Sequence, residues 1–204
     1  AIAKMSHNLG IRVLAEGVET EQSICSSLKA SINLYQGFYF SKAQKDIKDR
    51  DIEFIESKIS KIAKIFKEKN IDAIKAKSKA IDTYDNMAAS IISKISSLDT
   101  FNKNLKAACL TYENIEAVYL IDIKTSRQIH DTLVLKNIND RFKATKNGFE
   151  HYLKEYYYIT IESKKGIFLS QKYISYATGS LCKTFAKRFT LNNKSYILCI
   201  DIVL

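Results

Sequence analysis

The stretch KTFAKRFTLNNKSYILCIDIV, residues 183–203, decides the fold of the larger part of the chain. Both of its halves are rich in β-branched and aromatic residues, and a turn signal at 192–194 separates them. The runs of this composition are residues 117–123, 166–170, 183–189 and 195–203. Short runs of this kind, separated by turns, predict an antiparallel sheet.

A long helical stretch precedes this sheet. Between residues 46 and 110 there is no Pro or Gly, and apolar residues recur at helical spacing. The pattern predicts two long helices, or one with a break near Asn70. Its apolar stripe is either intramolecular core or the contact face of a connector or coiled coil. A helix laid across the sheet gives an α+β domain from about residue 85 onward.

The first 40 residues alternate between helix and strand. A helix ending at Gly10, an apolar run at 11–15, a helix at 19–30 and a second run at 32–40 are typical of a parallel sheet or (β/α) barrel. Two strands cannot close a barrel, and such strands are buried by neighbours on both faces. Residue 1 already belongs to a helical pattern, so we expect a fragment of a longer protein.

Composition limits the function classes. The net charge of +10 would suit nucleic acid, but the lysines are mixed with acids and there is no Arg-rich run. A solvated helical face is therefore the expected reading. No apolar stretch reaches the roughly 20 residues that span a bilayer, so we expect a cytoplasmic chain with no membrane span and no nucleic-acid partner.

Cysteine and histidine give no metal or redox motif. The four cysteines form no CxxC pair, and we expect buried reduced thiols. His7, His130 and His151 have no partner at metal-ligand spacing, so we expect surface residues and no metal ligand.

Two motifs carry a family resemblance. LGIRVLAEGVET at 9–20, followed by YQGFYFSK at 35–42, resembles the closing portion of an EAL domain over about residues 1–45. The resemblance implies part of a (β/α)8-type barrel that hydrolyses cyclic-di-GMP with divalent metals, usually Mg²⁺ or Mn²⁺.

The resemblance also implies site residues in the intact protein. Glu16 follows the first apolar strand, where catalytic groups of such barrels lie, and it matches the catalytic glutamate that would accept a proton from water. Glu19 would hold the geometry of the site, or cap the next helix. Gln36 would bind the nucleotide, or complete the barrel end.

The family's metal-binding residues come earlier in the barrel and are absent here. We therefore expect no cofactor in this fragment and no phosphodiesterase activity. The intact protein is expected to be a cyclic-di-GMP phosphodiesterase or, if a metal ligand is missing, a receptor for that nucleotide.

A second set of motifs resembles Cache or PAS-like sensor domains over roughly residues 85–204. The segments that carry it are YLID at 119–122, KEYYY at 154–158, LSQKYIS at 169–175, TGSLCKT at 178–184 and LCIDI at 198–202. The resemblance implies a long helix before a sheet and a pocket for a small polar ligand. The implied pocket residues are Tyr156, Tyr157, Tyr173, Thr184 and Asp201.

One departure bears on the ligand. Lys154 and Glu155 stand where many amino-acid-binding members have Arg-Pro, and a lysine lacks the fork of donors that suits a carboxylate. The tyrosines have a plainer reading as core residues with bonded hydroxyls. Asp201 is either exposed or faces a ligand.

The sequence thus predicts an α+β chain with a truncated (β/α) barrel remnant at 1–45, a helical connector at 46–84 and a PAS/Cache-like antiparallel sheet with a long N-terminal helix at 85–204. The expected function is a sensory module that binds a small ligand and tunes cyclic-di-GMP hydrolysis in the intact protein, as a homodimer. The alternative is a dimerisation scaffold that senses nothing.

Overall fold

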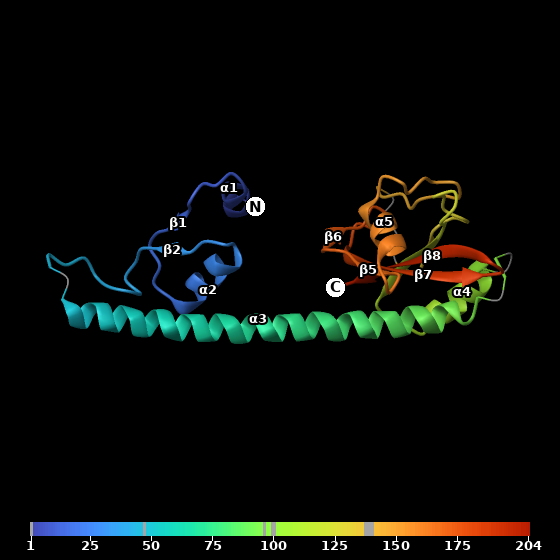
Figure 1. Ribbon diagram of the computed structural model, residues 1–204. Coiled ribbons are helices and arrows are strands. Elements are labelled where there is room, and N and C mark those ends of the chain that lie inside the picture. Colours follow the sequence, from blue (N-terminus) through green and yellow to red (C-terminus); the bar gives the residue numbers. More distant parts are fainter. Residues whose placement is uncertain (1, 47, 96, 99–100, 137–140) are drawn as a thin grey trace. The chain divides into compact units, whose positions relative to one another are not determined.

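The computed structural model describes residues 2–46, 48–95, 97–98, 101–136 and 141–204. It divides into two compact units, Ala1–Lys77 and Ser78–Leu204. The helix α3, Asp49–Ile92, contributes its first part to one unit and its last part to the other (Figure 1). The point of division lies within the segment predicted as a connector.

The first unit contains a parallel strand pair. Its elements before α3 are α1 (Ile2–Asn8), β1 (Leu14–Ala15), α2 (Glu21–Lys29) and β2 (Leu34–Tyr35). Leu14 pairs with Leu34 and Ala15 with Tyr35. The strands are shorter than the predicted apolar runs, because each has one neighbour and a parallel strand is normally paired and covered on both sides.

A small core joins this strand pair to α3. Val18 and Ile24 are buried together with Ile62 of α3. The strand faces remain apolar and exposed, since Leu14 and Leu34 are 45% and 41% accessible. The local order of helix, strand, helix and strand is the one that the sequence predicts.

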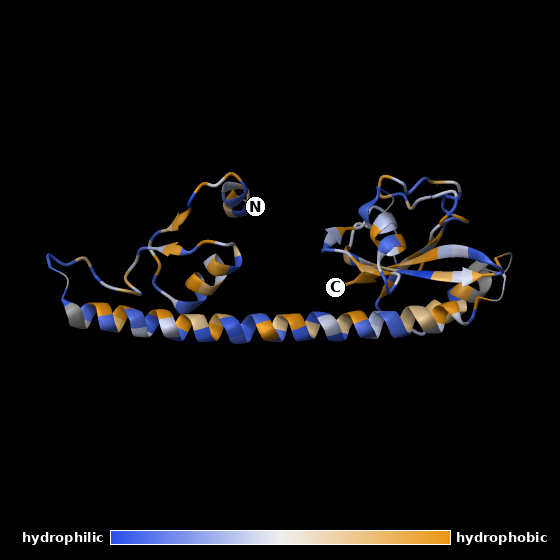
Figure 2. Ribbon diagram, viewed as in Figure 1, coloured by the Kyte–Doolittle hydropathy of each residue, from blue (hydrophilic) through white to orange (hydrophobic). Residues whose placement is uncertain are grey.

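The helix α3 is continuous through Asn70, so the predicted break near that residue is wrong. Asn costs a helix interior less than about 0.7 kcal/mol relative to Ala, and no Gly or Pro adds to it. Hydrophobic and hydrophilic residues alternate along α3 (Figure 2). A second helix, α4 (Phe101–Cys109), follows.

The second unit is built on one antiparallel sheet. The strands are β3 (Ile115–Asp122), β4 (Leu133–Val134), β5 (Ile167–Leu169), β6 (Tyr173–Ile174), β7 (Leu181–Leu191) and β8 (Lys194–Val203), with α5 (Glu155–Glu162) before β5. The order is β4-β3-β8-β7-β5, and β6 also pairs with β7. This confirms the predicted sheet.

The hairpin β7–β8 forms the centre of the sheet. Leu191 pairs with Lys194 across a two-residue turn. Asn192 and Asn193 in this turn have φ of 48° and 61°. Two successive positive φ values fit the twist of a tight hairpin, and Asn tolerates them better than most residues.

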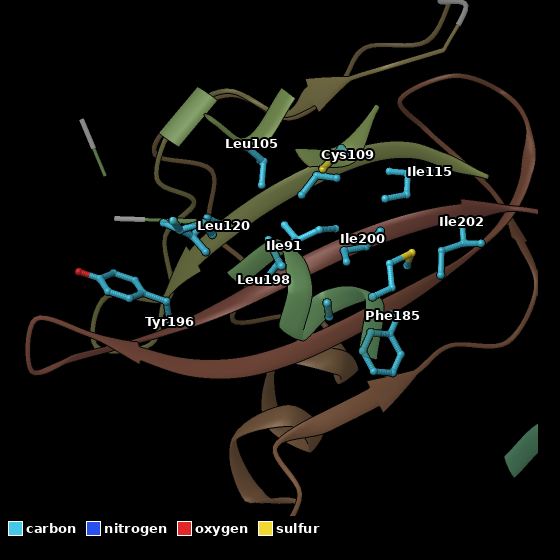
Figure 3. Packing of buried hydrophobic residues seen from close by; sticks show 14 residues of the cluster. Ile91, Leu105, Cys109, Ile115, Leu120, Phe185, Tyr196, Leu198, Ile200 and Ile202 are labelled. Atoms are coloured by element: carbon cyan, nitrogen blue, oxygen red, sulfur yellow. The ribbon is translucent and has the colours of Figure 1, made fainter. Parts of the chain in front are cut away.

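The two faces of the sheet have different cover. One face packs against the end of α3 and against α4, where Ile91, Leu105 and Cys109 meet Phe185 and Leu198 (Figure 3). The other face carries a smaller cluster that includes Tyr119, Ile197, Cys199 and Tyr157 of α5. The side chains of successive residues in β7 and β8 therefore point to opposite faces of the sheet.

The expected state of the thiols is confirmed: all four cysteines are free and buried. No helix within the described part of the chain is long and apolar enough to cross a membrane.

Candidate functional site

A cavity of about 810 Å³ lies on the α5 face of the sheet in the second unit. Its wall includes six aromatic rings and a group of polar side chains at the sheet surface. The aromatic residues are Tyr119, Phe149, Tyr156, Phe168, Tyr173 and Tyr176. This volume lies within the range of about 300–1,000 Å³ that is usual for small-molecule sites.

Asp201 supplies the buried charge of the cavity. The residue is 5% exposed, and its Oδ1 accepts hydrogen bonds from Thr184 Oγ1 at 2.8 Å and from the Tyr173 hydroxyl at 3.0 Å. Burial raises the pKa of Asp201 to about 6, although both hydrogen bonds act to lower it. Asp201 is thus buried and not exposed, and it lines the cavity.

A second polar group forms another part of the wall. His151 Nδ1 lies 2.6 Å from the Tyr156 hydroxyl, and His151 Nε2 lies 3.2 Å from Gln128 Oε1. The imidazole stacks on Tyr119, with ring centroids 5.4 Å apart. Burial, and secondarily the charge of Lys154, lower the pKa of His151 to about 4, so the ring is neutral at neutral pH.

The prediction that His151 is a surface residue is therefore wrong. It is 2% exposed, because Tyr119, Tyr156 and Phe149 enclose the ring. His130 is half-buried, which also differs from the prediction, and His7 is exposed as predicted.

Four of the five predicted pocket residues come together in the cavity wall: Tyr156, Tyr173, Thr184 and Asp201. Tyr157 does not, because successive residues of α5 point about 100° apart. Its hydroxyl donates to the carbonyl of Ile123 at 2.7 Å. The reading of the tyrosines as core residues fits Tyr157, whereas Tyr156 and Tyr173 combine bonded hydroxyls with a place in the wall.

The sequence reasoning missed two buried polar residues at this face. Gln128 is 1% exposed and belongs to the network of His151. Glu116, also 1% exposed, stands at an irregularity in the pairing of β3 with β8 and accepts a hydrogen bond from Thr178 Oγ1. Glu116 Oε2 has no partner among the described residues. Neither residue stands in a motif, so only the tertiary structure reveals them.

The residues matched to the EAL motifs lie at one end of the strand pair in the first unit. Glu16 follows β1 and Gln36 follows β2. The backbone N–H of Gln36 donates to the carbonyl of Ala15 at 2.8 Å. The side chains of Glu16, Glu19 and Gln36 are exposed. The alternative that Glu19 caps the next helix is wrong, because Thr20 is the N-cap and its hydroxyl accepts from the Ser23 amide.

Two lysines of α3 contact segments that follow Glu19 and Gln36 in the sequence. Lys61 forms an ion pair with Glu21 at the start of α2, and Lys58 donates to the carbonyl of Tyr39. The hydrogen bond and charge of Lys61 hold the pKa of the Glu21 carboxyl below its usual range. Gly37 fits closely here, since a Cβ on it would lie 2.2 Å from the backbone of Val18.

The residues present do not fit a metal site. Within the described ranges, no group of three or more His, Cys, Asp or Glu side chains could hold a metal ion. Glu16 and Glu19 alone do not make a ligand set, so no chemical step can be derived through a metal held by these residues.

Comparisons with known proteins agree with the N-terminal motifs and with the fold. Residues 1–43 match the family model of the EAL domain. The whole chain is similar in structure to the Bacillus subtilis YkuI protein, which has an EAL domain and was crystallised with its substrate c-di-GMP and calcium. The TM-score is 0.69 with 18% identity, over 100% of this chain and 51% of that chain. The chain thus spans about half the length of YkuI and shares its fold.

Two chemoreceptor domains show weaker likeness. The sensory domain of Campylobacter jejuni Tlp3, with isoleucine bound, has a TM-score of 0.41 and 14% identity, over 65% of this chain and 53% of its own. The ligand-binding domain of Pseudomonas fluorescens CtaA, in complex with L-isoleucine, has 0.43 and 20%, over 67% and 52%. No curated protein matches the chain in sequence. The predicted EAL sequence at the N-terminus is confirmed over residues 1–43.

Proposed function

We propose that the second unit binds a small ligand in its cavity and tunes cyclic-di-GMP hydrolysis by the EAL domain of the intact protein. The observation that carries the proposal is the cavity itself, which combines an aromatic wall with a buried carboxylate, Asp201. Among the residues that the structure describes, no cation forms an ion pair with Asp201, and such a buried charge is costly in a protein that has no use for it. A ligand that interacts with Asp201 supplies that use.

The strand β7 provides the link from the cavity to α3. Thr184 faces the cavity, and its neighbour Phe185 packs on the other face, where its ring centroid lies 6.0 Å from that of Tyr84. Two residues further on, Lys187 forms an ion pair with Asp85 of α3 at 2.5 Å. A ligand that moves Thr184 therefore moves a strand held directly against α3.

The other end of α3 contacts the EAL loops through Lys58 and Lys61. In this proposal the ligand shifts α3 between two arrangements that differ in ligand affinity, which is the thermodynamic requirement for coupling. Glu16 acts as general base, Glu19 holds the loop and Gln36 binds the nucleotide. In the intact protein this site would need a divalent metal, Mg²⁺ or Mn²⁺, held by ligands that the described residues do not provide.

The test compares c-di-GMP turnover by the intact protein with wild-type Asp201 and with Asp201→Asn. A change in turnover or in its dependence on added small molecules, with Tyr158→Phe on the exposed side of α5 as control, supports the proposal. Equal turnover under all conditions, together with a concentration-dependent dimer, would contradict sensing and support the dimerisation scaffold instead.

A further inference from the structure

The side-chain amide of Gln128 has a fixed orientation. Its Nε2 lies 2.9 and 3.2 Å from the carbonyl oxygens of His130 and Thr145, and 3.0 Å from Thr132 Oγ1, and its two protons are shared among these acceptors. Main-chain carbonyls can only accept, so the atom facing them must be the NH₂ group. Gln128 Oε1 consequently points the other way, where it accepts from Thr145 Oγ1 at 2.6 Å.

This orientation fixes the tautomer of His151. Because Gln128 Oε1 can only accept, the His151 Nε2 that lies 3.2 Å from it must carry the proton. A neutral imidazole has one N–H, so Nδ1 is an acceptor. The Tyr156 hydroxyl, 2.6 Å from Nδ1, must therefore donate its proton to His151.

The part of the cavity wall formed by Tyr156, Tyr173, Thr184 and Asp201 offers acceptors. Tyr156 has committed its only proton to His151, so its oxygen offers lone pairs alone to a ligand. The hydroxyl protons of Tyr173 and Thr184 are committed within the group around Asp201 Oδ1, since Thr184 donates to that oxygen and Tyr173 donates within the same group. The remaining oxygen of Asp201 is also an acceptor.

The cationic side chains of the cavity are exposed. Lys143, Lys154 and Lys172 line the cavity, but all three are exposed, so their ammonium groups meet the outer part of a ligand or solvent. Tyr156, Tyr173 and Asp201 themselves present aromatic faces and oxygen acceptors. Aromatic faces attract cations as well.

We propose that Gln128 and His151 act as positioning residues that set the hydrogen-bond polarity of this wall, so that it accepts a protonated amine and rejects a carboxylate. The inference rests on the proposed function, because it names the class of ligand group that the same cavity binds. It assigns specificity to two residues that need not contact the ligand. They act by making the Tyr156 hydroxyl donate its proton to His151 Nδ1, which leaves the Tyr156 oxygen as an acceptor for the ligand.

The first measurement is the protonation of His151 in the whole chain, by NMR detection of both ring nitrogens. The protonated nitrogen must be Nε2. A ring protonated on Nδ1 would overturn the inference whatever the ligand is.

The second measurement titrates the same chain with two probes of similar shape, butylamine and butyrate, up to tens of millimolar. Butylamine should bind and shift resonances of Tyr156 and Asp201, and butyrate should bind roughly tenfold or more weakly at this position. Tighter binding of butyrate contradicts the inference and leaves the proposed function intact. Binding of neither probe also contradicts the inference, whereas the proposed function is decided by its own turnover test.

Two variants separate the role of the hydrogen bonds from Gln128 through His151 to Tyr156 from a role in packing alone. Gln128→Met removes the acceptor for Nε2, which frees His151 to change tautomer and should reduce the preference for butylamine several-fold. Tyr156→Phe leaves Gln128 in place and serves if the first variant does not fold. It should weaken butylamine binding and leave the proton on Nε2, while Tyr158→Phe should change neither quantity. Unchanged selectivity in a folded Gln128→Met or Tyr156→Phe protein would refute the proposal.

Discussion

Replacing Asp201 by Asn should stabilise the ligand-free chain at neutral pH, although Asp201 accepts two hydrogen bonds. Its folded pKa of about 6 lies above the ordinary value of 3.8, so folding disfavours the charged form. The free energy of unfolding is therefore highest below about pH 4, where Asp201 is protonated in both states. It falls as the pH rises through about 6, where the folded protein loses this proton. The loss is about 3 kcal/mol at about 1.4 kcal/mol per pH unit.

Asn removes the charge and keeps one oxygen acceptor. Its hydrogen bonds from Thr184 and Tyr173 are weaker than those to a carboxylate, by about 1 kcal/mol in total. The expected gain above pH 7 is therefore about 2 kcal/mol, and it should vanish near pH 4. For a chain of this size the gain corresponds to an increase in Tm of about 4–8 °C.

The assay is urea unfolding followed by circular dichroism at a series of pH values, since the chain has no Trp. Asp131→Asn is the matched control. Asp131 is exposed, and its pKa is lowered by the Asn147 amide and by Lys146, so its charge is favoured by folding. That variant should lose stability at neutral pH. If Asp201→Asn were no more stable than wild type at pH 7, the conclusion that burial of the Asp201 charge costs stability would be refuted.

Three further changes test other parts of the structure. Gly37→Ala places a Cβ 2.2 Å from the Val18 backbone and should destabilise the first unit by about 1–3 kcal/mol, seen as faster amide exchange in residues 15–40; unchanged exchange would contradict the close fit. Ile91→Ala in the core of the second unit should cost about 2–5 kcal/mol in urea unfolding, and a cost below 1 kcal/mol would argue against this packing. Burial raises the pKa of the Cys109 thiol to about 12 and of the Cys182 thiol to about 11, so neither should react with a disulfide reagent at pH 8 until the chain unfolds, whereas fast reaction in the native state would contradict their burial.

Local pattern was sufficient for the sheet and for the long helix. The Asn-Asn turn and the alternation in residues 183–203 determine the β7–β8 hairpin, because both signals act over a few residues. The break predicted near Asn70 is absent, since a single Asn weakens a helix too little to interrupt it. The two-residue strands β4 and β6 have too few residues for a periodic pattern.

The candidate site was predictable only where a motif carried it. Tyr156, Tyr173, Thr184 and Asp201 stand in motifs and line the cavity, whereas the orientation of Tyr157 depends on the helix α5 that the sequence analysis did not predict. His151 and Gln128 lie 23 positions apart, and their contact depends on how the chain between β3 and α5 folds back. No local signal reports a contact of that kind.

The most direct test of the central claim, that the second unit is a ligand-binding sensor, is native mass spectrometry of the purified chain at two protein concentrations. The account predicts a bound small molecule on wild type that is lost in Asp201→Asn. A chain that carries no ligand with either residue, and whose mass shows only a concentration-dependent dimer, would contradict it.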